Sequence, residues 1–430
     1  MKNNNGYNVK TRFRKIRKSF NLEKNKLFDD IAKLEPKSVA NTIKITWSKA
    51  KDFSLFDDSG NQWIDLTSGI FVSNAGHSNP LIKKAIKKQV DNDLLFAYNY
   101  PTQIKYDFLK KLLELSPSNF DSVALLNSGS EAMDIIYKLI KLYGIQKKKK
   151  YIVTFKMNYH GRGLSTDLIS GSKEKASWSG VEDKNIHFLD FPYAESDTFI
   201  PESLPPAEQI AGFVIETFQG WGAWFYPQKF IDELYLFARK HGALIAFDEL
   251  QAGFYRLGPI YGYMTYGEHI EPDLVGLGKG ISSSLPIGGV LGKKEIFDID
   301  EKADLHGTHS GNAVSCAAAL ANLDFLSGKN QVQKRKELIK MFREELISLE
   351  TEPLVKKVNV RGVIAGVIFE KGEDAIAIVK DCINQGVLPV CTNRNSIKIA
   401  PPLTISGEAL VEAIGVLRLA IHRQAEKISK

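Results

Sequence analysis

The sequence predicts an α/β fold, in which a mostly parallel central sheet carries helices on both faces and is joined to a smaller α+β domain. From about residue 121, short apolar runs bounded by polar residues alternate with helical patterns. Strands that alternate with helices form parallel sheets with right-handed crossover connections. The chain has 430 residues, and this length suits one large domain and one small domain.

The large domain is predicted from apolar runs that are typical of buried parallel strands. These strands are residues 123–126, 151–155, 212–215, 243–247 and 287–291. A polar turn, Asn127-Ser128-Gly129-Ser130, follows the first strand and precedes apolar residues at helical spacing up to Ile140. Further helices are expected at residues 230–241 and 311–326.

After residue 326 the pattern changes to that of a small α+β domain. It comprises an amphipathic helix at 336–349, short strands near 363–369 and 396–399, and a last helix near 408–426. The turn residues Ser59-Gly60-Asn61 predict a hairpin over residues 58–65 that can join this domain. The predicted divisions are a basic N-terminal arm (1–35), the N-terminal part of the small domain (36–75), the large domain (76–326) and the C-terminal small domain (327–430).

The composition excludes several classes of protein. Hydrophobic residues make up 43% and charged residues 25%, which is ordinary for a soluble globular protein. No stretch reaches the ~18 apolar residues of a membrane span. The cysteines, Cys316, Cys382 and Cys391, are scattered without a CxxC pair, so a reducing, cytoplasmic location is expected.

Much of the formal charge of +7 is local, because residues 1–22 hold seven Lys or Arg and no acid. Residues 147–150 form a second basic run. An anion-binding or targeting arm is one interpretation, and a mitochondrial presequence is a version of it. A solvated tail and a solvated loop are favoured. The tail lacks the aromatic interleaving and fold signature of a nucleic-acid module, so no nucleic-acid partner is expected.

Two residues carry the strongest chemical signal. Asp248 follows the predicted strand 243–247, at the end where open α/β sheets bind ligands. Lys279 lies in the glycine-framed stretch Gly276-Leu277-Gly278-Lys279-Gly280, where desolvation lowers the pKa of an amine and favours a Schiff base. Such a pair suits pyridoxal phosphate, which needs an imine anchor and a partner for its pyridinium nitrogen. Taken alone, the two residues could equally be a surface lysine and a helix N-cap.

Three weaker signals accompany this pair. Gly129 and Ser130 begin a helix, where free N–H groups can bind an anion, although an ordinary N-cap explains them equally well. Tyr159 could stack on a flat heterocycle or be a core aromatic residue. Glu216 ends a strand and could order neighbouring polar groups or be a loop acid. A Walker loop is excluded because Asp273 and Gly280 occupy its Gly and Ser/Thr positions, and no metal site is expected.

Several ordered blocks resemble the class III aminotransferases, a family of pyridoxal-phosphate enzymes. The resemblance runs from about residue 53 to about residue 421. Its early marks are Asp58, Gly60, Trp63, Asp65, Gly76-His77 and Pro80. Its later blocks are residues 248–258, which hold the acid, glutamine and glycine-rich turn; residues 272–279, which hold the lysine; and residues 307–312 and 399–403.

The resemblance implies a role for each site residue and a homodimer with shared active sites. Lys279 would hold the cofactor as an internal aldimine and carry a proton shift, while Asp248 would pair with the pyridine nitrogen. The other implied cofactor contacts are Gln251 to the phenolic oxygen, Tyr159 stacked on the ring, Gly129 and Ser130 at the phosphate, Glu216 in the surrounding network and Thr308 at the phosphate of the neighbouring subunit.

The substrate side departs from the family pattern. Trp221 stands where many relatives carry Glu, and Lys398 stands where they carry an Arg that takes an α-carboxylate. Arg and Lys are not interchangeable at a bidentate carboxylate site. Lys398 could meet a carboxylate or phosphate as a point charge, Arg394 could substitute for the missing Arg, and Trp221 offers an apolar wall.

The predicted function is therefore a ping-pong aminotransferase that moves an amino group from a small-molecule donor to a keto or aldehyde acceptor. A racemase, an aminomutase or a decarboxylase would use the same scaffold and the same first chemical step. A non-catalytic binding protein of this fold is a further alternative, which the presence of Lys279 disfavours.

Overall fold

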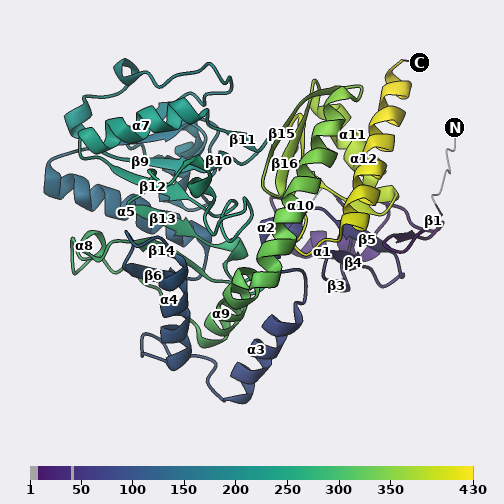
Figure 1. Cartoon of the computed structure of the whole chain (residues 1–430), viewed down its shortest axis with the longest axis horizontal. Helices are drawn as coiled ribbons and strands as arrows, with labels where there is room; N and C mark the ends of the chain where they lie inside the picture. The colour runs from purple at the N-terminus through teal and green to yellow at the C-terminus, as the bar shows by residue number, and fades with distance from the viewer. Residues whose placement is uncertain (1–7, 40–42, 430) are drawn as a thin grey trace. The chain divides into compact units, whose positions relative to one another are not determined.

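The computed structural model describes residues 8–39 and 43–429 (Figure 1). The chain divides into two compact units, which we call the larger unit (Pro80–Gln333) and the smaller unit (Met1–Asn79 with Lys334–Lys430). Each unit has a sheet and a buried apolar core of its own. The domain boundaries drawn from the sequence stay a prediction.

A seven-stranded sheet forms the centre of the larger unit, in the order β6-β14-β13-β12-β9-β7-β8. The strands are β6 (Ser122–Leu126), β7 (Tyr151–Phe155), β8 (Ile186–Leu189), β9 (Ile210–Glu216), β12 (Leu244–Asp248), β13 (Leu274–Leu277) and β14 (Gly288–Gly292). β14 is antiparallel to both of its neighbours, whereas the pairs from β13 to β8 are all parallel. The prediction of a mostly parallel sheet is confirmed. β8 and β13 lie outside the predicted strands, since β8 has polar neighbours and β13 is only four residues long.

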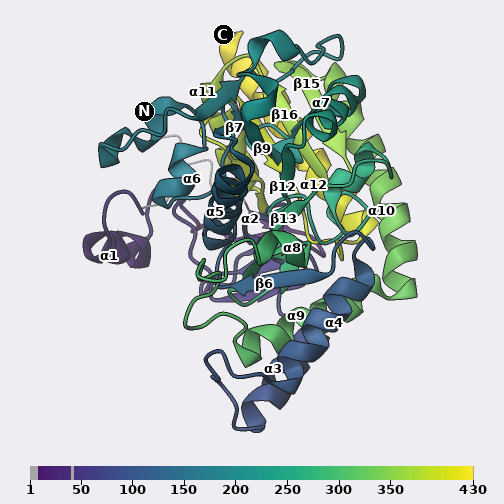
Figure 2. The same ribbon diagram turned by 90° about the vertical axis from the view of Figure 1, so that its left-hand side faces the viewer.

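Helices pack against this sheet and against one another. They are α3 (Pro80–Asp91), α4 (Gln103–Leu115), α5 (Gly129–Lys147), α6 (Leu164–Leu168), α7 (Gln228–Lys240), α8 (Lys294–Phe297) and α9 (Ala313–Ser327). α5 packs on β9, β13 and β14, and α7 packs on β12. α3 and α4 both lie against α9, as Figure 2 shows. Short elements are η1 (Lys173–Ser179), η2 (Pro201–Ser203), η3 (Ala207–Gln209), η4 (Gly262–Tyr266), η5 (Lys279–Ile281) and the pair β10 (Phe218–Gln219) and β11 (Trp224–Phe225).

The apolar spacing of α5 sets how closely it approaches the sheet. Met133, Ile136, Leu139 and Ile140 are all fully buried. Gly276 in β13 lies directly under this face, because a Cβ atom there would be 2.7 Å from the Met133 sulfur. Glycine at this position therefore lets the helix sit against the strand that leads to Lys279.

The smaller unit has two sheets. Its strands are β1 (Val9–Lys10), β2 (Lys15–Ile16), β3 (Lys49–Lys51), β4 (Ser54–Phe56), β5 (Gln62–Asp65), β15 (Val355–Arg361), β16 (Ile364–Phe369), β17 (Val387–Leu388), β18 (Val390–Cys391) and β19 (Ser396–Ile399). Its helices are α1 (Lys26–Leu34), α2 (Ser68–Phe71), α10 (Lys329–Ile347, which begins in the larger unit), α11 (Gly372–Asn384), α12 (Gly407–Ile428) and η6 (Ser348–Thr351). One sheet has the order β1-β2-β5-β4-β3 with β17 beside β5, and the other has the order β15-β16-β19-β18. The antiparallel pair β4–β5 is the predicted hairpin.

The basic N-terminal stretch is partly structured, unlike the solvated tail favoured from the sequence. β1 and β2 pair with each other, and β2 pairs with β5. Arg14 donates from Nε to Glu412 at 2.5 Å and from a terminal nitrogen to the Gln385 carbonyl at 2.5 Å. These partners are remote in sequence, so local charge could not reveal them. Residues 1–7 lie outside the described residues.

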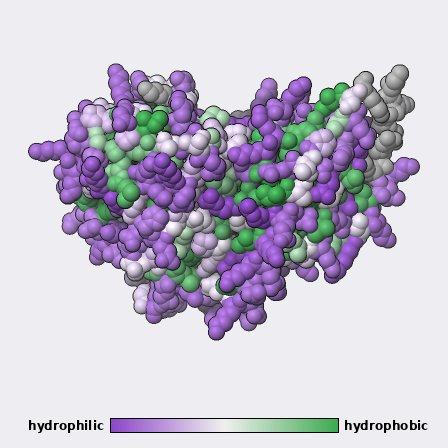
Figure 3. All heavy atoms as spheres, turned by 45° about the horizontal axis from the view of Figure 1, so that its top comes forward, coloured by the Kyte–Doolittle hydropathy of each residue, from purple (hydrophilic) through white to green (hydrophobic). Residues whose placement is uncertain are grey.

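The surface is largely polar. Hydrophilic residues cover much of the face shown in Figure 3, with smaller apolar areas between them. None of the helices in the described part of the chain is long and apolar enough to cross a membrane.

Candidate active site

Two neighbouring strands of the larger unit end in carboxylates, and a lysine follows the next strand. Glu216 ends β9 and Asp248 ends β12, and the two residues are direct partners in the parallel register. Both carboxylates are buried. Asp248 also pairs with Gly276 of β13, three residues before Lys279. Parallel strands thus bring two acids and one lysine to the carboxyl edge of the sheet, where α/β folds bind ligands.

Asp248 is held by two donors. Its Oδ1 accepts the Leu250 backbone N–H at 3.0 Å, and its Oδ2 lies 2.8 Å from Nδ1 of the fully buried His160. The Asn158 amide nitrogen lies 3.3 Å from Nε2 of that histidine. If the amide donates to Nε2, the ring proton is on Nδ1 and is donated to Asp248. This chain of contacts orients the carboxylate of Asp248.

Lys279 is poised to act as a nucleophile. It has a φ of 43°, in the left-handed region that costs a non-glycine residue about 1–3 kcal/mol. Burial lowers the pKa of its amine below the ordinary value, while the negative charges of Asp248 and Glu216 oppose that shift. A lowered pKa leaves more of the lysine as the neutral amine, which is the form that attacks a carbonyl.

Close backbone approaches surround the start of α5. Ser128 caps the helix and forms a capping box with Glu131, which takes up the Glu131 N–H and leaves those of Gly129 and Ser130 to face an anion. The Ser130 hydroxyl accepts the Arg162 backbone N–H at 3.3 Å. A Cβ atom at Gly161 would lie 2.6 Å from that hydroxyl. Glycine therefore lets this loop lie across the helix end.

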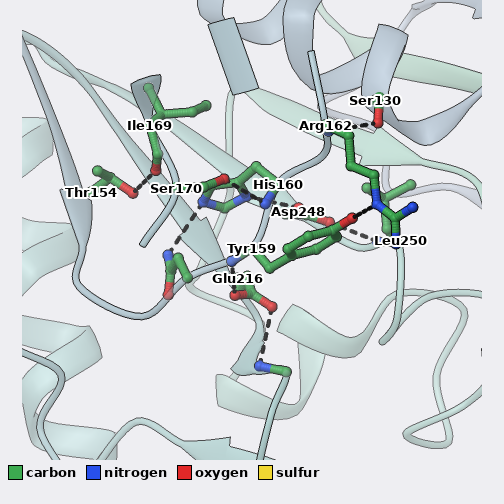
Figure 4. A network of polar contacts seen from close by, with 12 residues as sticks. Ser130, Thr154, Tyr159, His160, Arg162, Ile169, Ser170, Glu216, Asp248 and Leu250 are labelled. Atoms are coloured by element: carbon green, nitrogen blue, oxygen red, sulfur yellow. Dashed lines mark hydrogen bonds and ion pairs between the residues drawn. The ribbon is translucent and has the colours of Figure 1, made fainter. Parts of the chain in front are cut away.

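Glu216 orders the segment that carries Tyr159. Its two oxygens accept the backbone N–H groups of Tyr159 at 2.8 Å and of Gly220 at 3.1 Å (Figure 4). A Cβ atom at Gly220 would be 2.5 Å from Nε2 of Gln251, so Gln251 lies against this turn. The Tyr159 ring is 42% exposed, and a stacked ligand ring would cover it.

Seven residues predicted from the sequence thus lie around one edge of the sheet. They are Gly129, Ser130, Tyr159, Glu216, Asp248, Gln251 and Lys279. Thr308 lies on an exposed loop before α9 and hydrogen-bonds to no described residue, and its role stays a prediction.

The residues predicted for the substrate side fall in both units. Trp221 of the larger unit donates from Nε1 to the Gln219 side chain at 2.7 Å and packs near Tyr193 and Trp224. Lys398 of the smaller unit is buried in β19, with Nζ 4.3 Å from the centre of the Phe71 ring. Arg394, in the turn before β19, is exposed.

Sequence reasoning gave no role to His160 or Arg162. Arg162 donates from Nε to the Tyr159 hydroxyl at 2.9 Å, and Figure 4 shows the two side chains facing each other. Both residues lie within three positions of Tyr159, so the sequence placed them near the site. Their partners, Asp248 and Ser130, are remote in sequence, and nothing local indicates those contacts.

The donor set fits a phosphorylated heterocyclic cofactor. The first turn of α5 with Ser130 suits a phosphate, Asp248 suits a protonated ring nitrogen, and the neutral amine of Lys279 suits a carbonyl. Gly278 supports this fit, since a Cβ atom there would lie 2.4 Å from a Leu250 methyl and 3.3 Å from the Gly129 Cα. Glycines at 129 and 278 therefore keep the helix end, the lysine segment and Leu250 in contact.

Comparisons with known proteins agree with this chemistry. The model of the family described as aminotransferase class-III matches residues 36–421. The chain is 28% identical to the probable 4-aminobutyrate aminotransferase of Bacillus subtilis, over 90% of this chain and 95% of that protein. It is also 28% identical to the isoleucine 2-epimerase of Lentilactobacillus buchneri, over 91% and 93%. A solved structure of the ornithine aminotransferase of Toxoplasma gondii, described as having partial occupancy of PLP, is also similar. The TM-score is 0.83 at 21% identity, over 95% of this chain and 97% of that one.

Replacing His160 by leucine tests the support of Asp248. The substitution leaves a buried carboxylate oxygen and the Asn158 amide without a partner, so we expect the free energy of unfolding to fall by about 1–3 kcal/mol. Urea denaturation measures this change. His269→Leu is the control, because His269 is exposed and bonds to Asp232 on the surface. Equal losses in the two variants would show that the His160 contact adds no stability.

Proposed function

This chain belongs to the class-III aminotransferases, and from that premise we propose how its own residues perform the reaction. The enzyme uses pyridoxal phosphate and transfers an amino group from an amino donor to a carbonyl acceptor. Bound pyridoxal phosphate supplies a carbonyl that condenses with amines and a ring that takes up electron density. One observation carries the proposal: Lys279 lies beyond β13, next to the in-register pair Glu216 and Asp248.

We propose that Lys279 and Asp248 have separate roles in the reaction. Lys279 holds the cofactor through Nζ and, once released by the amino donor, moves a proton with the same atom. Asp248 would face the ring nitrogen of the bound cofactor, where a carboxylate favours a protonated nitrogen. His160 would hold Asp248 in the orientation for this contact, since its Nδ1 lies 2.8 Å from Oδ2.

The remaining cofactor contacts follow from where the larger unit places its polar groups. We propose that Gly129 and Ser130 bind the phosphate with the first-turn N–H groups of α5 and the Ser130 hydroxyl. Tyr159 stacks on the ring, Gln251 meets the phenolic oxygen, and Glu216 orders the segments on either side of them. The contacts of Glu216 with the Tyr159 and Gly220 N–H groups support this assignment.

We propose that the enzyme is a homodimer in which Thr308 reaches the phosphate bound by the partner subunit. The loop that carries Thr308 is braced by an apolar segment, because His309 packs on Phe96 at 4.9 Å and Asn312 donates to the Leu95 carbonyl at 2.8 Å. This segment is exposed at Leu95, Phe96, Tyr98 and Tyr100. A contiguous exposed apolar surface marks an interaction site, and a second copy of the chain would cover it.

We propose that Arg162 is the main receptor for a substrate carboxylate. Its guanidinium is held beside Tyr159 through Nε, and its terminal nitrogens hydrogen-bond to none of the described residues. Lys398 has less freedom because its ammonium already lies over the Phe71 ring, a contact that stabilises a cation. Trp221 would then be an apolar wall, and substrate contacts of Lys398 and of the exposed Arg394, which both belong to the smaller unit, stay a prediction. The 4-aminobutyrate named for one relative carries such a carboxylate.

We further propose a cytoplasmic location. All three cysteines are free, and Cys316 and Cys382 are buried. Free thiols are typical of a reducing compartment.

Substitution of Lys279 by alanine tests the proposed anchor. We expect loss of the visible absorbance of the lysine-bound cofactor and a fall in turnover of about 10²–10⁴-fold, because no other amine takes over the proton transfer. Lys184→Ala is the control, since Lys184 is an exposed lysine. Donors labelled with ¹⁵N distinguish the reaction types: the label must appear in a second molecule, and label that stays on the donor would indicate a racemase or mutase.

Substitution of Arg162 by alanine tests carboxylate recognition. A hydrogen-bonded charge pair contributes about 1.5–3 kcal/mol, so we expect the Michaelis constant of a carboxylate-bearing substrate to rise by about 10- to 100-fold. Arg162→Lys should restore part of the effect. Lys398→Ala serves for comparison, and a larger rise there than in Arg162→Ala would reverse the assignment of the two residues.

Substitution of Phe96 by aspartate tests the dimer. A charge within the apolar brace should shift the protein from dimer to monomer in sedimentation velocity and weaken retention of the cofactor, because Thr308 no longer reaches the partner. Trp178→Asp places the same charge on another exposed aromatic residue and should leave both properties unchanged. A wild-type protein that sediments as a monomer would refute the proposed dimer.

A further inference from the structure

A second carboxylate lies directly after Asp248 and has no role in the site described above. Glu249 is fully buried. Its Oε1 accepts the Thr217 hydroxyl and the Tyr263 backbone N–H, the latter at 2.8 Å, and its Oε2 accepts the Gly262 backbone N–H at 2.6 Å. Burial raises the pKa of this carboxyl to about 7, against the effect of these three hydrogen bonds. Burying a carboxyl group costs free energy, which its hydrogen bonds must offset.

Two of these donors stand at the returning end of one buried loop, and the third, Thr217, directly follows β9. Residues 250–263 leave the end of β12 and return to it at the start of η4, and most of them are buried. Loops normally run over the surface because a buried loop carries backbone groups that need partners. Glu249 supplies those partners to Gly262 and Tyr263 at the returning end, and its own carbonyl accepts the Gly253 N–H at 2.8 Å.

The loop is strained and closely packed around this carboxylate. Phe254 and Tyr255 have φ values of 56° and 71°, a conformation that non-glycine residues rarely adopt. A Cβ atom at Gly253 would lie 2.8 Å from the Glu249 carbonyl oxygen, and one at Gly262 would lie 2.6 Å from the Ala252 Cβ. Strain of this kind persists only where the surrounding contacts fix the backbone, and Glu249 makes the central ones.

The departing end of the same loop lies in the cofactor site. Leu250 donates its N–H to Asp248 and touches the start of α5, since a Cβ atom at Gly129 would be 2.3 Å from a Leu250 methyl. The next residue is Gln251, which lies against the Gly220 turn. Any shift of the loop would therefore move Gln251 relative to Asp248.

We propose that Glu249 is the positioning residue of the site, which clamps the loop of residues 250–263 to the end of β9 and so fixes where Gln251 stands. The inference rests on the proposed function, in which Gln251 meets the phenolic oxygen of the cofactor. Both carboxylate oxygens are needed, because each accepts a backbone N–H. An amide in place of the carboxylate would direct its own NH₂ group at one of these donors.

The test compares Glu249→Gln with Gln251→Ala and with the double variant, at a pH well above the carboxyl pKa. Two properties are measured: the visible spectrum of the lysine-bound cofactor and the rate at which the cofactor dissociates in gel filtration. We expect Glu249→Gln to shift the band as Gln251→Ala does and to speed dissociation by about tenfold. If Glu249 acts through Gln251, the double variant should match Gln251→Ala within about twofold, because coupled residues are not additive.

Two further variants keep the test decisive. Glu268→Gln makes the same change at an exposed glutamate close in sequence and should leave both properties as in the wild type. Thr217→Val removes one donor to Glu249 and keeps a methyl group where the Thr217 methyl faces Gly262, so it should change both properties in the same direction by a smaller amount. If Glu249→Gln fails to fold, the proposal is overturned by a Thr217→Val protein whose spectrum and cofactor dissociation rate equal those of the wild type.

The outcomes also separate this inference from the proposed function. Wild-type protein that takes up no cofactor would refute the proposed function itself. Wild-type protein that binds the cofactor, together with a Glu249→Gln protein whose spectrum and dissociation rate are unchanged, would refute only the role of Glu249. Effects of Glu249→Gln and Gln251→Ala that multiply in the double variant would also refute it, since they would mark two independent contributions.

Discussion

The parallel pairing of β9, β12 and β13 is the constraint on which the site depends. Register makes Asp248 the direct neighbour of both Glu216 and Gly276, so the acids and the lysine segment share one edge of the sheet. A shift of one residue would turn each of these side chains to the opposite face. Register is fixed by burial on both faces, because β9, β12 and β13 are buried along their whole length. The chemistry is thus set by the same packing that stabilises the core.

Burying three carboxylates so close together requires specific compensation. Asp248 takes an N–H from Leu250 and a histidine nitrogen, Glu216 takes two backbone N–H groups, and Glu249 takes two N–H groups and a hydroxyl. Most of these donors belong to the backbone of loops that leave the sheet. The acids therefore organise the loops, and the loops in turn supply hydrogen bonds that compensate for burying the acids. Only Lys279 lies among them with a pKa that burial pulls down.

The sequence predicted the parts of the fold and site that depend on local pattern. Runs of apolar residues predicted β7 and β12, and apolar residues at helical spacing predicted the buried face of α5. Both patterns arise because an element carries apolar side chains on each face that it buries. Asp248 was found because it follows such a run, and Lys279 because it lies in a glycine-framed apolar stretch. The strands β1 and β2 were missed because strands of two residues carry little apolar pattern. The pairing of His160 with Asp248 was missed because it joins residues 88 positions apart.

The same distinction explains why the cofactor side is easier to predict than the substrate side. Cofactor contacts depend on backbone N–H groups and on glycines at positions where a Cβ atom would collide, as at Gly129, Gly220 and Gly278. Because such positions accept almost no residue other than glycine, they can be recognised in the sequence. Trp221, by contrast, is held by a side-chain bond to Gln219 and by neighbouring rings, and many other residues would fit the same backbone. The proposed substrate contacts therefore involve side chains that the fold does not dictate.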